Sequence, residues 1–572
     1  MRYELIKERN PQLSLLQQVL TNRGIRDVDH YLHTSDADIL NPCLFPNMNK
    51  GVKLFIEEQR KNSKTLLLVD SDVDGITSSA IIYNYVHRLW PNWDWKYFLH
   101  SEKQHGLNDC VNYIIDKEFE FVIVPDAGSN DFEELKLLAS KGIKVLCLDH
   151  HECSQETQDA IVINNQMCDY PTKSLSGAGV VYKFCQRLDE VFSNNIADDF
   201  LDLAAVGICA DMMPLTDYET HRIIEKGLNN VQNPFLMAMM ERNEFYLKGH
   251  INPRGVSFYI APTMNAVMRV GTLEERTLLF EGLLEDHASQ LVPSGKRGAK
   301  GEMVPLVDEA VRQSSNVKSR QSKAQESKVK DIIALIEEQQ LNNNKMLIIC
   351  QDQDLEGMTG LIANKLMAQY KKPVLLLQRG TSPEGKTIYS GSARNIPHGP
   401  IEDLRGFLES TRLVLYAQGH KSALGTSLLA DNVDAFIDTV NYQLQDADFS
   451  SAYKVDDIIT SAKLNKDDIV SLYGARDLWG QDISEPYIAI TGVKVSPADV
   501  FINEKILKIT DMSKGIYYTK FKPTPEELMF FSSLGKTRTL DIVGTCSYSD
   551  YDKAPVINIT DYNVSKDSYW DF

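Results

Sequence analysis

Acidic side chains and a histidine pair stand at the ends of apolar runs in the first half of the chain, and their types suit metal chemistry. Three aspartates alternate in VDSDVDG, another follows an apolar run in VPDAG, two histidines follow an aspartate in LDHH, and a further aspartate lies in AAVGICADMM. Carboxylate oxygens are ligands for Mg²⁺ and Mn²⁺, and an added imidazole shifts the preference toward Mn²⁺. These residues are Asp70, Asp72, Asp74, Asp126, Asp149, His150, His151 and Asp211.

Each group follows or interrupts a run that we interpret as a strand: Leu66–Val69, Phe121–Val124, Val145–Leu148 and Leu203–Cys209. The carboxyl ends of parallel strands meet at one crevice, so the groups are expected to converge. Extended backbone through VDSDVDG would place its three aspartates on one face. Two divalent ions held there, with Asp126 as the expected bridge, would activate water and stabilise both oxygens of a phosphodiester displacement.

Two other metal sites fit the residues less well. A calcium loop would need a glutamate at its twelfth position, which here is Ile81. Cys147 and Cys153 flank the His pair, but the nine cysteines form no C-x-x-C pair and Cys147 lies inside an apolar run, which favours a core role over zinc binding. Any one aspartate is more often a helix cap or a turn residue, so the joint arrangement carries the metal prediction.

The elements around these residues alternate between strand and helix. Lys64–Val69 and Lys144–Leu148 read as strands, and Thr77–Leu89 and Phe132–Ser140 as helices, which predicts βαβ units with a parallel sheet. The basic segment SSNVKSRQSKAQESKVK suits a solvated helix or a contact with nucleic acid, and both interpretations stay open. The expected divisions are a helical leading segment (1–50), an α/β domain (51–235), a helical connector (236–330), a second α/β domain (331–445), and a connector with a β-rich tail (446–572).

The tail contains five β-rich runs: PYIAITGVKV, KILKIT, GIYYTKF, RTLDIVGTCSY and PVINITDY. Strands at such spacing favour a small barrel, and the OB-fold is a common barrel that holds single-stranded nucleic acid.

Composition indicates an ordinary globular chain with 43% hydrophobic and 24% charged residues. No run approaches the ~20 apolar residues of a membrane span, and the opening MRYELIKERNPQ lacks a signal-peptide core, so we expect a soluble cytoplasmic protein with no membrane partner. The net charge of −19 argues against a nucleic-acid partner. A locally positive cleft, with metal-binding carboxylates holding part of the negative charge, would remove that objection.

In their order and spacing, VDSDVDG, VPDAG, LDHH and AAVGICADMMPLT resemble the DHH phosphoesterase superfamily. The blocks APTMNAVMRVG, YSGSARNIP and QGHKSALG further resemble its RecJ-like branch of exonucleases specific for single-stranded DNA. The resemblance implies an α/β fold in which a DHH catalytic lobe with a parallel sheet and a DHH-associated lobe surround a cleft, with an OB-like β-barrel at the C-terminus.

Carried over residue by residue, the resemblance implies two Mn²⁺ or Mg²⁺ ions held by Asp72, Asp74, Asp126, His150 and Asp211.

Three further residues take implied catalytic roles. Asp70 would be a metal ligand or would support one, and Asp149 would orient an imidazole. His151 would contact the scissile phosphate or assist proton transfer, although a structural histidine is the alternative.

The implied substrate contacts lie in later blocks. Ser392 and Arg394 match residues that grip the 5′-terminal phosphate, since a guanidinium pairs bidentately with phosphate oxygens. Gly419 and His420 match a glycine-rich loop that approaches the nucleotide. The block between the lobes contributes Asn265 and Arg269, and Arg269 suits a surface ion pair equally well.

The chain also departs from the family pattern. Leu68 stands where many DHH proteins have a histidine ligand, and Thr263, Met268 and His100 stand where Arg, Gly and Arg are usual. These departures concern DNA affinity and end preference more than catalysis.

The leading hypothesis is a metal-dependent 5′ to 3′ exonuclease that hydrolyses single-stranded DNA with a 5′-phosphorylated end to mononucleotides, in DNA repair, recombination or replication. A single-strand-binding protein or a helicase stays open as a partner. One alternative is a phosphodiesterase for short oligonucleotides or cyclic dinucleotides, although such enzymes generally lack the barrel. Another is a non-catalytic binding scaffold, which the retention of every principal ligand position argues against.

Overall fold

The computed structural model describes residues 1–101, 104–153, 155–299, 301–355, 357–397, 399–449 and 452–565. The chain forms two compact units. The smaller contains Met1–Ile6 and Ser319–Val455, and the larger contains Lys7–Lys318 and Asp456–Phe572. The long helix α16 (Leu306–Glu338) spans the boundary between them. Within the described residues, no helix combines the length and apolar character needed to cross a lipid bilayer.

The larger unit contains a five-stranded sheet in the order β3-β2-β4-β5-β6, and every neighbouring pair is parallel. Side chains alternate between two apolar layers: Leu67 and Val69 join one core, while Leu66 and Leu68 join the other. Its strands are β2 (Thr65–Val69), β3 (Trp95–Leu99), β4 (Phe121–Pro125), β5 (Lys144–Asp149) and β6 (Ile161–Asn164).

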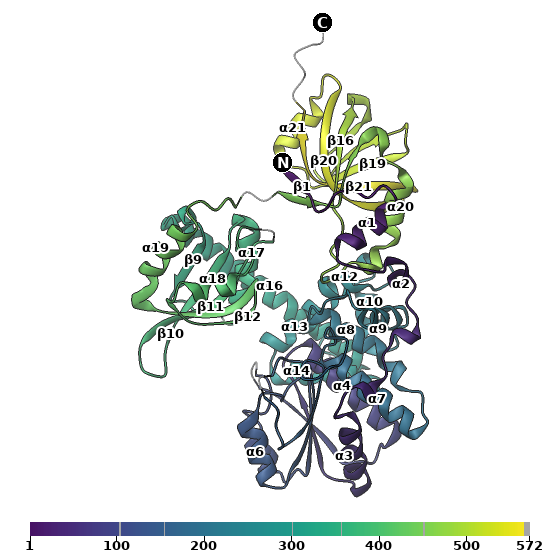
Figure 1. Ribbon diagram of the computed structural model, residues 1–572, viewed down its shortest axis with the longest axis vertical. Coiled ribbons are helices and arrows are strands. Elements are labelled where there is room, and N and C mark those ends of the chain that lie inside the picture. Colours follow the sequence, from purple (N-terminus) through teal and green to yellow (C-terminus); the bar gives the residue numbers. More distant parts are fainter. Residues whose placement is uncertain are drawn as a thin grey trace. The chain divides into compact units, whose positions relative to one another are not determined.

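Helices cover both faces of this sheet, with α6 on one side and α3 and α7 on the other (Figure 1). The covering helices are α3 (Met48–Lys61), α4 (Val73–Leu89), α5 (Val111–Asp116), α6 (Phe132–Ser140) and α7 (Gly177–Phe192). Helix layers on a parallel sheet leave the carboxyl ends of the strands free to form a site.

Two local expectations were wrong. The run Leu203–Cys209 is part of helix α8 (Leu201–Ala210), not a strand. A short run that is apolar on all sides suits a buried helix as well as a buried strand, and α8 is buried against α4, α7 and α9 (Tyr218–Asn229). VDSDVDG is not extended throughout, because Asp72 caps α4 and Asp74 lies in its first turn.

The start of the chain also differs from expectation, since it forms strand β1 (Tyr3–Leu5) rather than a helix. Within the smaller unit, β1 pairs in parallel with β14 (Tyr453–Val455). The expected short helices follow as α1 (Leu15–Asn22) and α2 (Val28–Leu32).

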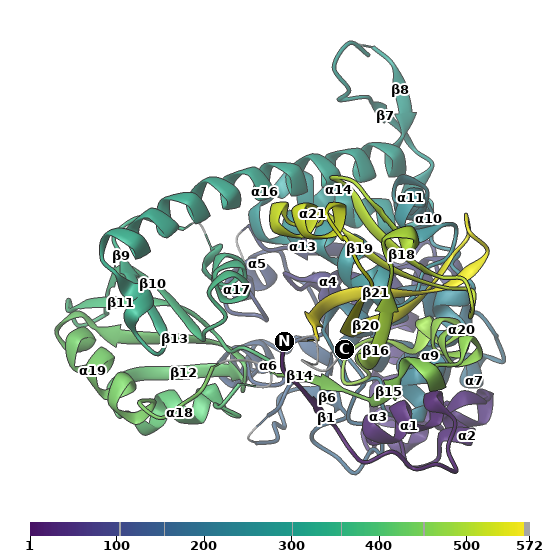
Figure 2. The ribbon, with the colours of Figure 1, turned by 90° about the horizontal axis from the view of Figure 1, so that it is seen from above.

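Between α8 and α16 the larger unit is mainly helical. A π-helical turn, η4, runs directly into α13, and a two-stranded hairpin projects beyond α10 and α11 (Figure 2). The elements are α9 (Tyr218–Asn229), α10 (Pro234–Arg242), α11 (Glu244–Leu247), α12 (Pro253–Gly255), η4 (Val256–Ile260), α13 (Ala261–Val270), α14 (Leu273–Leu283), α15 (Glu285–Ala288), β7 (Leu291–Pro293) and β8 (Met303–Pro305).

The smaller unit is the second α/β lobe. Its sheet has the order β12-β13-β11-β10-β9, in which β9 and β10 are parallel and the other pairs are antiparallel. Its elements are β9 (Leu347–Gln351), α17 (Thr359–Tyr370), β10 (Val374–Thr381), β11 (Thr387–Arg394), α18 (Leu404–Ser410), β12 (Val414–His420), β13 (Ala423–Leu429) and α19 (Val433–Gln443).

The C-terminal part of the larger unit is β-rich, and all five runs singled out in the sequence form strands. The sheet order is β15-β16-β20-β21-β19-β18-β17, consistent with an OB-like region. The fold class is therefore confirmed as α/β with a parallel sheet and a C-terminal OB-like region. The elements are β15 (Asp457–Thr460), α20 (Lys466–Gly474), β16 (Ile488–Val495), β17 (Val500–Ile502), β18 (Ile506–Asp511), β19 (Ile516–Phe521), α21 (Pro525–Ser532), β20 (Arg538–Ser549) and β21 (Ala554–Val564).

Candidate metal centre

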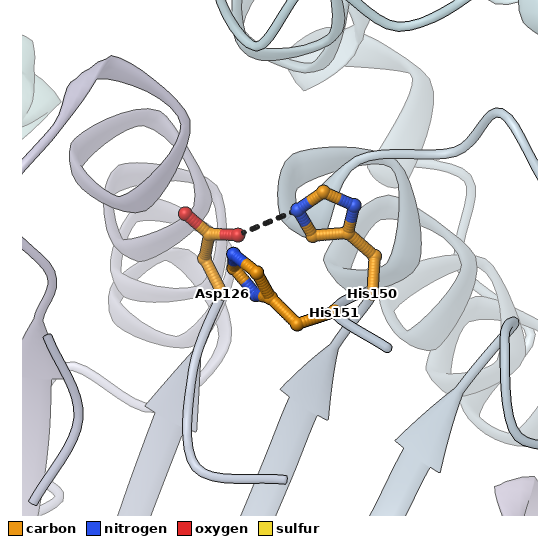
Figure 3. A group of neighbouring side chains, drawn as sticks. All are labelled: Asp126, His150 and His151. Atoms are coloured by element: carbon orange, nitrogen blue, oxygen red, sulfur yellow. Dashed lines mark ion pairs between the residues drawn. The ribbon is translucent and has the colours of Figure 1, made fainter. Parts of the chain in front are cut away.

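Asp126 and His150 face each other at the carboxyl ends of β4 and β5 (Figure 3). Asp126 Oδ1 lies 3.2 Å from His150 Nε2. Both atoms are buried, and within the described part of the chain neither makes a hydrogen bond. Buried polar atoms normally have a hydrogen-bond partner or a bound ion, so this unsatisfied pair is suited to binding a cation.

Two further carboxylates approach the same imidazole nitrogen. His150 Nε2 lies 3.5 Å from Asp211 Oδ2 and 3.8 Å from Asp74 Oδ2. Asp211 reaches this point from the C-terminal end of α8, and Asp74 from the first turn of α4. Three of the predicted carboxylate ligands therefore approach the imidazole nitrogen of a fourth predicted ligand, although the four residues come from four separate elements.

The carboxylate of Asp74 is fixed by the N-terminus of α7. Its Oδ1 accepts hydrogen bonds from Ser176 Oγ at 2.7 Å and from the Ala178 N–H at 3.1 Å, and its Oδ2 accepts the Gly177 N–H at 2.7 Å. A helix N-terminus supplies free N–H donors and favours negative charge. The sheet, α4 and α7 thus determine together where Asp74 points.

Asp70 and Asp72 lie beside this group. Asp72 caps α4 by accepting the Gly75 N–H at 3.0 Å. Asp70 is fully buried, its Oδ2 lies 2.5 Å from His105 Nδ1, and its Oδ1 accepts the Gly106 N–H at 3.2 Å. Asp70 is thus held in place by polar contacts from the turn that contains His105.

The electrostatics of the centre favour a bound cation. Burial raises the pKa of Asp126 well above its usual value, and the negative charge of Asp74 raises it further. Burial and the charge of Asp74 likewise raise the pKa of Asp211 to about 8, while burial lowers the pKa of His150. Clustered carboxylates beside a neutral imidazole form a donor set for Mn²⁺ or Mg²⁺, so these residues fit a divalent ion.

The second histidine of the pair has a different environment. His151 Nδ1 lies 2.8 Å from Asp149 Oδ1, and half of its side chain is exposed. The hydrogen bond to Asp149 raises the pKa of His151 to about 9. Burial opposes ionisation of Asp149, but His151 lowers its pKa below the usual range. The Asp149 carboxylate is therefore in position to fix the orientation of the His151 ring, and it favours the protonated form of that imidazole.

A cavity of about 170 Å³ opens next to these groups. It is lined by Asp72, Asp74 and Asp211 from the centre, together with Asn265 and Arg269 of α13 and with His105. Burial lowers the pKa of Arg269, and the negative charge of Asp72 opposes that change. A cavity with carboxylates on one wall and amide and guanidinium donors on another suits a phosphate group neutralised by cations.

Two glycines, Gly207 and Gly177, allow the elements around the centre to approach this closely. A Cβ on Gly207 of α8 would lie 2.4 Å from Asp74 Oδ1, and one on Gly177 of α7 would lie 2.5 Å from Asp126 Oδ1. Neither position has room for a side chain.

The remaining predicted substrate residues gather on the sheet of the smaller unit. Ser392 of β11 pairs with Gly425 of β13, and its Oγ lies 2.8 Å from Thr359 Oγ1 at the start of α17. Arg394 lies over the same helix start, where a Cβ on Gly360 would come within 2.3 Å of its Nη2 atom.

Gly419 and His420 form the end of β12 in the same sheet. Gly419 has a φ of +125°, a conformation that strongly favours glycine. The structure thus brings the predicted residues together in two groups, one in each unit.

Sequence reasoning did not assign a role to His105, nor to the Ser176–Ala178 turn that holds Asp74. His105 lies in the string HGLN, which follows the polar residues SEKQ, and the turn lies in the small-residue string SGAG. Neither pattern distinguishes a site residue from an ordinary turn.

Comparison with known proteins places the chain among nucleases. Residues 64–208 match the model of the DHH family, N-terminal domain. The chain is 33% identical over 572 residues to YorK of Bacillus subtilis (strain 168), provisionally named an SPbeta prophage-derived single-strand DNA-specific exonuclease, with 99% of this chain and 98% of YorK covered. It is 27% identical over 461 residues to the single-stranded-DNA-specific exonuclease RecJ of the same strain, covering 77% of this chain and 54% of RecJ.

A solved structure gives the same likeness in fold. RecJ from Thermus thermophilus, crystallised in complex with Mn²⁺, matches with a TM-score of 0.73 and 20% identity, covering 97% of this chain and 76% of that one.

Proposed function

The chain belongs to the RecJ-like family of DHH phosphoesterases, and from that premise we propose that it is a metal-dependent exonuclease that degrades single-stranded DNA from a 5′-phosphorylated end to mononucleotides. The convergence of Asp74, Asp126 and Asp211 on the unsatisfied Nε2 of His150 carries this proposal. Two Mn²⁺ or Mg²⁺ ions would be held by Asp72, Asp74, Asp126, His150 and Asp211. Such ions supply Lewis-acid stabilisation of charge on the phosphate and acidify the attacking water.

The residues around the cavity position the scissile phosphodiester. The guanidinium of Arg269 and the amide of Asn265 donate to its non-bridging oxygens from α13. Water attacks the phosphorus and releases a proton to the solvent, and the bond between the phosphorus and the 3′ oxygen of the terminal nucleotide breaks. Protonated His151, oriented by Asp149, gives its Nε2 proton to that leaving oxygen. The products are a 5′-mononucleotide and a strand with a new 5′ phosphate.

A groove of about 650 Å³ between the helical connector and the β-rich region supports a long unpaired strand as substrate. The Tyr246 and Tyr259 rings in its wall stack 4.8 Å apart at 16°, and Phe258 is 66% exposed. Arg254 lies 5.9 Å from the Phe258 ring centroid, and Arg476 lies 4.8 Å from that of Tyr473. Exposed rings next to guanidinium groups suit the stacking of unpaired bases.

The groove and the centre are connected by one continuous helix. Phe258 and Tyr259 lie in the π-helical turn η4, which continues into α13 with Asn265 and Arg269. From Phe258 to Arg269 the helix advances about 16 Å. Pi-helical turns are rare and frequently occur at functional sites. This distance favours a substrate of several nucleotides over a dinucleotide.

In the smaller unit, Ser392 and Arg394 would receive the 5′ phosphate. Both lie at the start of α17, where free N–H groups and the guanidinium favour an anion.

The test is a time course on the full chain with single strands of DNA and RNA labelled at either end, in Mn²⁺, in Mg²⁺ or in chelator. We expect mononucleotides released from the 5′ end of DNA, with no product in chelator. A blunt duplex and a dinucleotide serve as comparison substrates. Hydrolysis in chelator, release from the 3′ end, or faster cleavage of the dinucleotide than of the long strand would each contradict the proposal.

A further inference from the structure

Tyr416 of β12 carries an aromatic ring on the same face of the smaller unit's sheet as Ser392. Ser392 pairs with Gly425 of β13, and Gly425 pairs with Gln418 of β12. Residues directly opposite each other on antiparallel strands share a face, and so do residues two positions apart along one strand. Tyr416 stands two residues before Gln418, so its side chain lies on the face that presents Ser392.

The ring lies close to the proposed position of the 5′ phosphate. A Cβ on Gly425 would lie 3.9 Å from Tyr416 Cε2, and Gly425 itself is one strand spacing, about 4.8 Å, from Ser392. Ser392 Oγ in turn lies 2.8 Å from Thr359 Oγ1 at the start of α17. Because Gly425 has no side chain, the sheet between the tyrosine ring and Ser392 is bare backbone at this position.

The local structure of β12 leaves this ring accessible. The pairing of β12 with β13 shifts its register between Val414 and Tyr416, and such bulges re-aim a side chain and often lie next to active sites. Tyr416 is 42% exposed, and within the described residues its side chain makes no hydrogen bond and no aromatic contact. An exposed ring on a strand is a platform on which a nucleic-acid base stacks.

A nucleotide combines the two groups that this face suits, a phosphate and a planar base joined by a sugar. We propose that Tyr416 stacks on the base of the 5′-terminal nucleotide whose phosphate Ser392 and Arg394 receive. This inference rests on the proposed function and adds a residue that recognises the terminal base. Every base has a π-face, so Tyr416 requires that a base is present but does not select a sequence.

The test uses two long single strands that differ only in the 5′-terminal residue. One ends in a 5′-phosphorylated adenine nucleotide, and the other in a 5′-phosphorylated tetrahydrofuran residue, which keeps the sugar ring and the phosphate but has no base. The full chain is assayed in Mn²⁺ for release of the labelled terminal residue. For the wild-type chain we expect KM to be about tenfold lower for the adenine strand, the effect of one stacked base.

Tyr416→Ala should raise KM for the adenine strand about tenfold and leave KM for the abasic strand unchanged, so that the two values become equal. Tyr416→Phe keeps the ring without its hydroxyl and should behave like the wild type. Tyr442→Ala removes an exposed ring of α19 in the same unit and is the matched control.

Equal KM values for the two strands in the wild-type chain would overturn the role of Tyr416. A Tyr416→Ala variant that keeps the tenfold preference would also overturn it, even if both strands bind more weakly, because a uniform loss reports damage to the unit and not a lost contact with the base. If the wild-type chain releases the terminal residue from neither strand, the proposed function itself fails, so the two failures are distinguishable.

Discussion

At the scale of single residues, Asp126 is held in a conformation that serves the site at a cost in stability. Its φ is +61°, its carboxylate is buried, and its Oδ1 makes no hydrogen bond within the described residues. Aspartate and asparagine tolerate this left-handed backbone better than other residues with a Cβ. A buried carboxylate among other carboxylates is destabilising until a cation is bound.

Asp126→Asn should therefore separate stability from activity. Without metal, we expect unfolding free energy to rise by about 0.5 to 2 kcal/mol, because the amide removes charge repulsion and keeps the backbone. Nuclease activity should fall by about 10²-fold or more. Thermal unfolding in chelator and the labelled-strand assay measure the two effects. Asp159→Asn, at an exposed position, is the control. A less stable Asp126→Asn variant, or an active one, would contradict this account.

His151 should determine the alkaline limit of the reaction. Its raised pKa of about 9 keeps Nε2 protonated at neutral pH, so kcat should fall as pH rises through 9. The stability that its pair with Asp149 contributes is likewise complete below the ordinary pKa of 6.5 and is lost as pH rises through 9.

His151→Gln keeps a polar side chain but cannot transfer a proton. We expect kcat to fall by about 10²-fold or more, with no alkaline limb, in a series of single-turnover rates across neutral and alkaline pH. An unchanged alkaline limb in this variant would assign that limb to another group.

At the scale of elements, the centre depends on three helix ends that meet at the edge of one sheet. Helices α4, α7 and α8 approach closely at Gly207, where a Cβ would come within 2.6 Å of Ala178 Cβ and 2.7 Å of Thr77 Oγ1. Protein interiors are close-packed, so an added methyl group must displace its neighbours.

Gly207→Ala should therefore destabilise the protein by about 1 to 3 kcal/mol and weaken Mn²⁺ binding, since the methyl group would move Asp74. Gly474→Ala at the end of α20 is the control, because no atom lies within 4 Å of the added Cβ. Urea unfolding in chelator and calorimetry with Mn²⁺ measure the two quantities. If the two variants behave alike, the close approach at Gly207 is not what positions Asp74.

The sequence predicted the strands of the catalytic sheet well, because β2, β4 and β5 are apolar runs too short for buried helices and are followed by polar residues. It failed for α8, whose residues are buried on all sides and therefore show no helical period. It placed Asp72 and Asp74 together for the wrong reason, since a helix start, not an extended strand, positions them. The contact between His105 and Asp70 could not be predicted, because the two residues come from separate segments of the chain.

At the scale of the whole chain, a net charge of −19 coexists with a groove of aromatic and guanidinium groups. Electrostatic attraction over the whole surface is thus a poor explanation for strand binding, and base stacking in the groove is the better one. Affinity for DNA should then depend less on salt than it does for basic nucleases.

Phe258→Ala should raise KM for a long single strand about tenfold, the loss of one stacked base, with kcat nearly unchanged. Cleavage of a dinucleotide, which is too short to reach the groove, should not change. Phe501→Ala, which removes an exposed ring of β17 outside the groove, is the control. Equal losses on the two substrates would show that Phe258 supports the fold rather than the strand.

The hydrogen bonds from the N-terminus of α7 to Asp74 would couple opening of that helix start to metal binding. The Gly177 and Ala178 amides donate to the carboxylate of Asp74, which we propose as a metal ligand, so local opening of that helix start would also disrupt the proposed metal site. Deuterium uptake at these two amides should therefore slow when the protein binds Mn²⁺. This measurement would report how fully the metal site is occupied, without nucleic acid and without turnover.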